Sequence, residues 1–175
     1  MDEGNMDPGK GIDIKIGITE DCMMNCRYCP QKHRDLQFSK ELVGPLVAFL
    51  KGTGKPIKID FFGGEPLLNY GIIRHIVERC KSQNVPIENF ELITNGVLAD
   101  REKIDYMAQN RFKLQFSIDG PEEVHLSNRR SNLTGINSHR KVMNVISYMR
   151  SRGYPYSVYA VFHRNTVHRL DDSMD

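Results

Sequence analysis

Hydrophobic and polar residues alternate strictly from Ile12 to Ile18, the pattern of a β-strand with one buried face. Short segments rich in β-branched and aromatic residues predict further strands at 57–62, 90–94, 112–118 and 156–162. Between these segments, apolar residues recur at helical spacing and predict helices over 39–51, 69–83, 100–110 and 137–152. Residues 119–134 show neither period and are predicted to form a long loop, and a further helix is expected after Thr166.

Individual residues refine these helix predictions. Pro45 interrupts the first helical segment, so the helix is expected to begin or to kink at this residue. Asp100 is the expected N-cap of its helix, and Gly153 is the expected C-cap of the last predicted helix. Cys80 continues an apolar helix face and is expected to be a buried free thiol, not a ligand.

Strands that alternate with helices are typical of βαβ units and of a parallel sheet. A complete barrel of eight such units needs about 250 residues. The 175 residues of this chain therefore hold about five β/α units of an α/β fold. In parallel α/β folds the carboxyl ends of the strands collect on one face, where ligands bind. The segments that follow the first four strands lie between residues 22 and 119. They are expected to line one ligand-binding site.

The composition limits the classes of function. A hydrophobic content of 39% and a mean hydropathy of -0.47 describe a chain that buries a core. Apolar runs are too short to span a membrane, and residues 1–11, without a secretory signal, are predicted to be a flexible leader. A net charge of +2 gives no reason to expect nucleic-acid binding. The expected compartment is the cytoplasm, where clustered cysteines more often serve metal or redox chemistry than disulfides.

Three cysteines, Cys22, Cys26 and Cys29, follow the first predicted strand at the spacing C-x3-C-x2-C. Cysteine thiolates at comparably short spacings hold iron–sulfur clusters. A four-iron cluster has four corners, so three cysteine ligands leave one iron open to another molecule. The alternative interpretation is a structural zinc site, because His33 would complete a Cys3His ligand set.

Three further motifs follow in order: FFGGEPLL at 61–68, ITNG at 93–96 and FSIDGP at 116–121. Together with the cysteine motif they resemble the radical S-adenosylmethionine (SAM) superfamily, over about residues 12–165. The closest resemblance is to the SPASM-type branch that includes anaerobic sulfatase-maturating enzymes and other peptide maturases. It implies a partial, TIM-like (β/α)6 barrel, followed by a C-terminal SPASM domain. By that standard residues 12–175 are a radical SAM core that stops one strand short and lacks the SPASM domain.

The resemblance also implies a chemistry. Cys22, Cys26 and Cys29 would bind a [4Fe–4S] cluster, and the open iron would bind the amino and carboxylate groups of SAM. An electron from the cluster would cleave SAM to methionine and a 5′-deoxyadenosyl radical that abstracts hydrogen from a substrate. The implied partners are a peptide or protein substrate and an electron donor such as flavodoxin or ferredoxin. A non-catalytic fragment that binds the cluster or SAM is a further alternative.

Two motif segments are implied to contact SAM near the cluster. Gly63, Gly64 and Glu65 match the segment that receives the amino group, where small residues allow a close backbone approach. Tyr28 matches an aromatic position near the adenine; the other interpretation of its ring is packing over the cluster.

Polar residues after the later strands are further candidates. Ser117 and Asp119 match positions that face the ribose or the methionine end of SAM, and Asn95 is a weaker candidate because Asn-Gly is a common turn. The SAM carboxylate requires a cation, for which Arg130 is selected. Its competitors are Arg129, Arg140 and Lys141. His125 is expected to be a surface histidine of the long loop.

Overall fold

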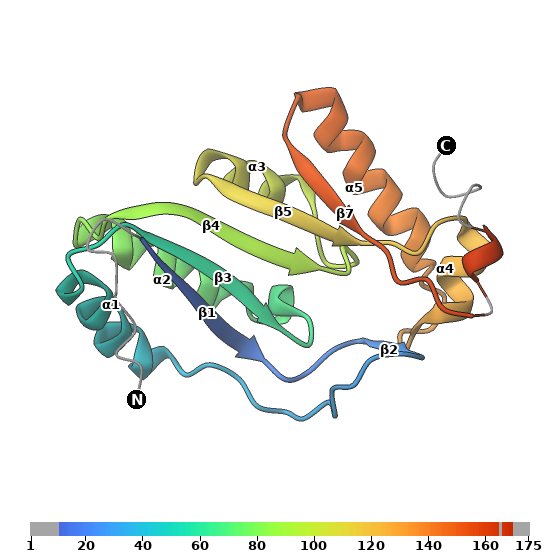
Figure 1. The fold of residues 1–175 in the computed structure, drawn as a ribbon, viewed down its shortest axis with the longest axis horizontal. Coiled ribbons are helices and arrows are strands. Elements are labelled where there is room, and N and C mark those ends of the chain that lie inside the picture. The colour runs from blue at the N-terminus through green and yellow to red at the C-terminus, as the bar shows by residue number, and fades with distance from the viewer. Residues whose placement is uncertain (1–10, 165, 170–175) are drawn as a thin grey trace, which may run out of the picture.

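Five parallel strands form one curved sheet (Figure 1). The strands are β1 (Ile12–Thr19), β3 (Ile57–Gly63), β4 (Ile87–Thr94), β5 (Phe112–Ser117) and β7 (Tyr156–Tyr159). Their order in the sheet is the order in which they occur along the chain, and every neighbouring pair is parallel. The computed structural model describes residues 11–164 and 166–169, so the predicted leader lies almost entirely outside the described residues.

Helices on one side of the sheet connect successive strands (Figure 1). They are α1 (Val43–Gly52), α2 (Tyr70–Ser82), α3 (Arg101–Gln109) and α5 (Ser138–Arg152). Short 3-10 segments are η1 (Lys40–Leu42), η2 (Pro66–Asn69) and η3 (Val167–Arg169). This alternation confirms the predicted α/β fold with about five β/α units. No helix in the described part of the chain has the length and apolarity that crossing a membrane requires.

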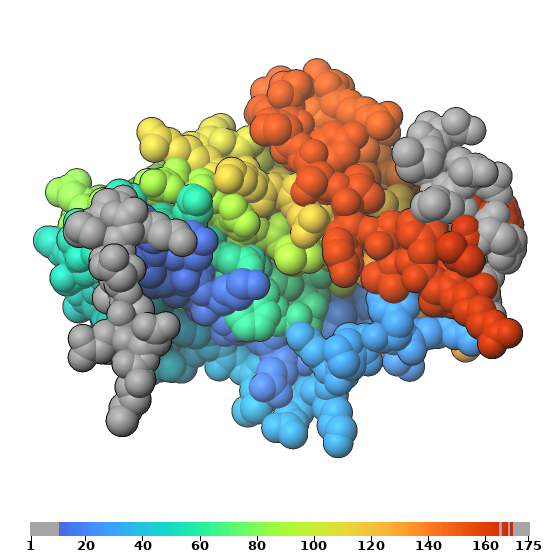
Figure 2. Space-filling model, viewed as in Figure 1, coloured from blue at the N-terminus to red at the C-terminus, as the bar shows by residue number. Residues whose placement is uncertain are grey.

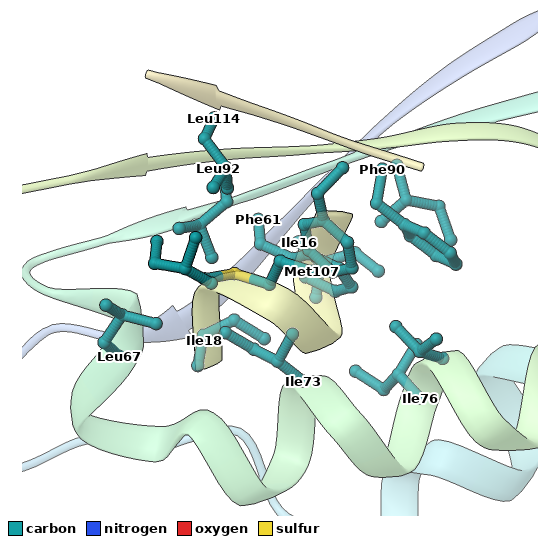
Figure 3. Close-up of a cluster of buried hydrophobic side chains, with 14 of the residues drawn as sticks. Ile16, Ile18, Phe61, Leu67, Ile73, Ile76, Phe90, Leu92, Met107 and Leu114 are labelled. Carbon is teal, nitrogen blue, oxygen red and sulfur yellow. The ribbon is translucent and has the colours of Figure 1, made fainter. Parts of the chain in front are cut away.

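The hydrophobic core lies between the sheet and these helices (Figure 3). Every second strand residue points toward the helices, as the alternating pattern predicts. The rings of Phe61, Phe90 and Phe112 stack across neighbouring strands, with centroids 5.0 to 6.0 Å apart. Each fully buried side chain of this size contributes about 1.5–3 kcal/mol, so the core holds the strands rigidly and fixes where their carboxyl ends lie.

The other face of the sheet is polar along most of its length. Lys15 Nζ of β1 lies 3.7 Å from Asp60 Oδ2 of β3, and Lys113 Nζ of β5 lies 3.5 Å from Glu91 Oε1 of β4. Nearer the carboxyl ends of the strands, this face of the sheet carries apolar side chains. Phe62 is 38% exposed and Ile93 is 40% exposed there.

The helix-end predictions were right in two cases and wrong in one. Asp100 caps α3 by accepting a hydrogen bond from the Lys103 amide, and Gly153 ends α5 with a φ of 66°. The α1 helix begins at Val43, not at Pro45. Pro45 lies in the first turn, where a backbone N–H would have no helical acceptor, so the helix accommodates proline without beginning at it. Cys80 is a buried free thiol, as predicted.

The prediction of a long loop over 119–134 was wrong. This segment contains the helix α4 (Glu122–Asn128) and the short strand β6 (Arg129–Ser131). β6 pairs antiparallel with β2 (Met24–Cys26), which lies inside the cysteine motif. A three-residue strand is too short to show a period, and its pairing partner lies about a hundred residues away, so local pattern could not reveal it.

His125 is buried in α4 and not on the surface, which corrects the sequence-based prediction. Its Nδ1 accepts a hydrogen bond from the Asp119 amide at 3.3 Å, and its Nε2 lies 3.1 Å from Ser138 Oγ. The pKa of His125 is lowered to about 4, mainly by burial and also by the nearby Arg129 guanidinium. His125 is therefore a neutral residue that joins α4 to the end of β5 and the start of α5.

Candidate functional site

The segment that carries the three cysteines, residues 20–29, is here called the cysteine loop, and its start is held by the end of β3. The Gly64 amide donates to the Thr19 carbonyl and the Glu65 amide donates to the Asp21 carbonyl, both at 2.8 Å. A Cβ on Gly63 would lie 2.1 Å from the Thr19 oxygen, and one on Gly64 would lie 2.1 Å from the Asp21 oxygen. The two glycines are therefore needed for backbone packing against the segment that leads into Cys22.

Glu65 joins the end of β3 to the end of β4 with a buried carboxylate. Its Oε1 accepts hydrogen bonds from Thr94 Oγ1 at 2.7 Å and from the Leu67 amide at 3.1 Å. Its Oε2 accepts one from the Asn95 amide at 2.8 Å. Burial raises the pKa of Glu65, and these three hydrogen bonds act in the opposite direction.

Asn95 contacts the cysteine loop directly. Its Oδ1 accepts a hydrogen bond from the Val97 amide at 2.9 Å, which makes the turn after β4. Its Nδ2 lies 3.4 Å from Met23 Sδ and 3.9 Å from Cys22 Sγ. Asn95 is thus both the turn residue that the Asn-Gly pair suggested and a neighbour of the first cysteine.

The three cysteines line one cavity of about 670 Å³ at the carboxyl ends of the strands. Cys22 and Cys26 are half-buried and Cys29 is exposed. Burial raises the pKa of Cys22 to about 12. Burial also raises the pKa of Cys26, while the Arg129 guanidinium lowers it. The other predicted residues that line this cavity are Tyr28, Gly63, Gly64, Glu65, Asn95 and Ser117.

Asp119 does not line the cavity, although it is a predicted site residue. Its carboxylate is fully buried and accepts hydrogen bonds from Tyr28 Oη at 2.6 Å and from the Val161 amide at 3.0 Å. Tyr28 belongs to the cysteine loop and Val161 follows β7; their parts of the chain lie side by side in Figure 2. Asp119 therefore connects the first and last parts of the site through protein contacts.

The structure places Arg129 at the cavity, and not Arg130, which the sequence analysis had selected. Arg129 is 6% exposed, lines the cavity, and pairs through Nη2 with Asp119 Oδ1 at 3.0 Å. Its guanidinium carbon lies 5.3 Å from the centroid of the Tyr28 ring. Arg130 is exposed and does not line the cavity. Neighbouring residues of a strand point to opposite faces, so only the strand assignment of 129–131 distinguishes the two arginines.

A multi-iron cluster and a single zinc ion make different demands on these side chains. In the described part of the chain, no three His, Cys, Asp or Glu side chains converge on one metal position. A Cys3His zinc site needs four ligand atoms about 2.0–2.3 Å from one ion. A four-iron cluster instead takes each cysteine on a separate iron. Arg129 Nε is buried without an acceptor among the described residues, and a metal-bound thiolate at Cys26 is an acceptor that would suit it in either kind of site.

Comparison with known proteins finds a family whose members this chain resembles in sequence. The radical SAM superfamily matches residues 16–175. The PqqA peptide cyclase of Bradyrhizobium diazoefficiens is 30% identical over 169 residues, which cover 94% of this chain and 42% of the cyclase. The cysteine-type anaerobic sulfatase-maturating enzyme of Clostridium perfringens strain 13 is 27% identical over 163 residues, covering 86% of this chain and 44% of that enzyme. The chain therefore spans less than half the length of these relatives.

A solved structure described as native anSMEcpe with bound AdoMet has the same fold. It superposes with a TM-score of 0.83 at 22% identity, over 93% of this chain and 47% of that chain. At this level of identity the likeness concerns the fold, and it confirms the predicted TIM-like partial barrel.

Proposed function

Because the chain belongs to the radical SAM superfamily, we propose that Cys22, Cys26 and Cys29 bind a [4Fe–4S] cluster and that the adjoining cavity binds SAM. The observation that carries this proposal is the convergence of the cysteine loop with the ends of β3, β4 and β5 around one cavity. When bound and reduced, the cluster would supply the electron that cleaves SAM to methionine and a 5′-deoxyadenosyl radical, which abstracts hydrogen from the substrate.

The residues of this chain would bind and orient SAM. Gly63 and Gly64 bring the backbone to the cavity surface, and Glu65, which lines the same cavity, would accept a hydrogen bond from the SAM amino group. Arg129 is our choice for the SAM carboxylate in place of Arg130, because its guanidinium lines the cavity. Ser117 and Asn95 would contact SAM from the ends of β5 and β4.

The proposed substrate is a peptide or protein, as for the maturases and the peptide cyclase that this chain resembles. The side chains of Phe62 and Ile93 form an apolar part of the cavity wall, and Gln115 of β5 and Tyr159 of β7 line the same cavity. Such a wall favours an uncharged side chain next to the radical. The proposal further includes an electron donor such as flavodoxin or ferredoxin, a cytoplasmic location, and residues 12–175 as the radical SAM core domain.

The test is anaerobic reconstitution with iron and sulfide, followed by reduction and electron paramagnetic resonance with and without SAM. A [4Fe–4S]⁺ signal that changes when SAM is added would support the proposal. One zinc per chain and no cluster signal would instead favour the Cys3His alternative. A signal that ignores SAM would favour the alternative of a non-catalytic fragment.

Replacement of Cys22, Cys26 or Cys29 by Ala is predicted to abolish cluster binding, because each supplies one iron ligand. Iron and sulfide content per chain measures this. Cys80→Ala is the matched control, since Cys80 lies on the buried face of α2 and outside the cavity. Full iron content in any of the three loop variants would contradict the cluster assignment.

A further inference from the structure

Arg129 and Cys26 face each other across the β2–β6 pair. They are direct partners in the antiparallel register. Directly opposed residues have Cβ atoms about 4.5–5.5 Å apart and project from the same face of the pair. The backbone pairing therefore holds a permanent positive charge beside one of the three proposed cluster ligands.

Asp119 supplies the opposing charge at the same place. It pairs with Arg129 at 3.0 Å, and both side chains are almost fully buried, with side-chain exposures of 7% for Arg129 and 0% for Asp119. The Tyr28 hydroxyl and the Val161 amide hold the carboxylate from two other segments.

Buried charges act more strongly than exposed ones, because water does not screen them. Reduction adds one negative charge to a cluster, so a nearby cation favours the reduced form and a nearby anion opposes it. Hydrogen bonds and local charge are among the factors that set the reduction potential of iron–sulfur clusters.

We infer that the buried Arg129–Asp119 pair sets the reduction potential of the cluster, with Arg129 raising it and Asp119 limiting that increase. This inference rests on the proposed cluster at Cys22, Cys26 and Cys29. It assigns Asp119 a positioning and electrostatic role in place of direct contact with SAM. It also explains why Asp119, which does not line the cavity, is fully buried among hydrogen-bond donors from three segments, those of Tyr28, Arg129 and Val161.

The test is a redox titration of the reconstituted protein without SAM, so that a role of Arg129 in binding SAM does not affect the result. Arg129→Gln is expected to lower the midpoint potential and Asp119→Asn to raise it. Each shift should correspond to about a tenfold change in the reduction equilibrium, ~59 mV for one electron. In the double variant the two shifts should largely cancel. Arg129→Lys, which keeps the charge, should stay close to the wild type.

Arg140→Gln is the matched control, because it removes the same charge from a side chain that is 73% exposed. Its potential should not change, since water screens it. Loss of the cluster in Arg129→Gln but not in Arg129→Lys would also support the inference, because charge distinguishes these variants. Shifts of the same sign in both single variants, unchanged potentials, or loss of the cluster in Arg129→Lys would overturn it. A wild-type protein without a cluster would instead contradict the proposed function.

Discussion

Glu65 shows how one side chain serves both the fold and the proposed site. Two of its three internal hydrogen bonds tie the end of β3 to the end of β4, the third is to Leu67 in η2, and Glu65 also lines the cavity. The sequence motif pointed to this residue as a contact for SAM. The hydrogen bonds to Thr94 and Asn95 required the tertiary structure, because these partners lie on the neighbouring strand.

Glu65→Gln is predicted to weaken SAM binding about tenfold, because a charge-assisted hydrogen bond to the SAM amino group is worth about 1.5–3 kcal/mol. The iron content should stay unchanged, since the cysteines are not altered. Equilibrium dialysis with labelled SAM measures the affinity, and Glu102→Gln on the exposed first turn of α3 is the control. An unchanged SAM affinity in Glu65→Gln would count against the role in binding the amino group.

His125 is predicted to make the folded protein less stable in acid. Burial lowers its pKa from 6.5 to about 4, so between these values the unfolded chain binds a proton that the folded chain does not. Stability must therefore fall as the pH falls through 6.5. The loss from this residue between pH 7.5 and 5 is about 2 kcal/mol.

Urea unfolding at the two pH values measures this loss. His125→Gln should reduce the difference in unfolding free energy between them, whereas His75→Gln on α2 should leave the difference as it is in the wild type. An equal pH dependence in wild type and His125→Gln would show that this histidine is not the group responsible.

At the scale of elements, the ends of strands decide where the site forms. β3 ends in two glycines that touch the backbone before Cys22, and β5 is followed by Asp119, which connects to Tyr28. The long strands and helices were predictable because their periodic patterns reflect burial on one face. The β2–β6 pair was not, because its stability comes from a partner distant in the sequence.

Gly64→Ala is predicted to reduce cluster occupancy and to destabilise the fold by about 1–3 kcal/mol, the usual range for overpacking. The added Cβ would lie 2.1 Å from the Asp21 oxygen, so the backbone that begins the cysteine loop must move. Gly71→Ala in α2 is the control, because its Cβ would meet nothing within 4 Å and alanine favours a helix. Iron content and thermal unfolding measure both variants; an unaffected Gly64→Ala would contradict the packing role.

At the scale of the whole molecule, the site joins segments from nearly the full length of the described chain. The cysteine loop near the N-terminus contacts the ends of β3 and β4 and pairs with β6. Through Asp119, which accepts hydrogen bonds from both Tyr28 and Val161, it is also joined to the segment after β7. A cluster bound to this loop would therefore stabilise contacts between distant parts of the sequence. A ligand that binds only the folded state of a protein stabilises that state by mass action.

Cluster removal is accordingly predicted to lower the unfolding temperature. A stabilisation of about 3 kcal/mol corresponds to a shift of about 6–12 °C for a chain of this size. Anaerobic thermal scans of reconstituted and cluster-free protein measure the shift. Cys26→Ser should show no gain after reconstitution, and equal unfolding temperatures in the two wild-type forms would contradict a cluster that is coupled to folding.

The sequence by itself determined the α/β class, the five parallel strands, most helix boundaries, and the cysteines and strand-end motifs that converge on one cavity. These features follow from local periodicity and from the rule that the carboxyl ends of parallel strands share one face. Only the tertiary structure decided that Arg129 lies at the cavity instead of Arg130, that Asp119 binds protein donors, and that His125 is buried. The physical reason is that each depends on the β2–β6 pairing and on α4, which are set by contacts between residues far apart in the chain.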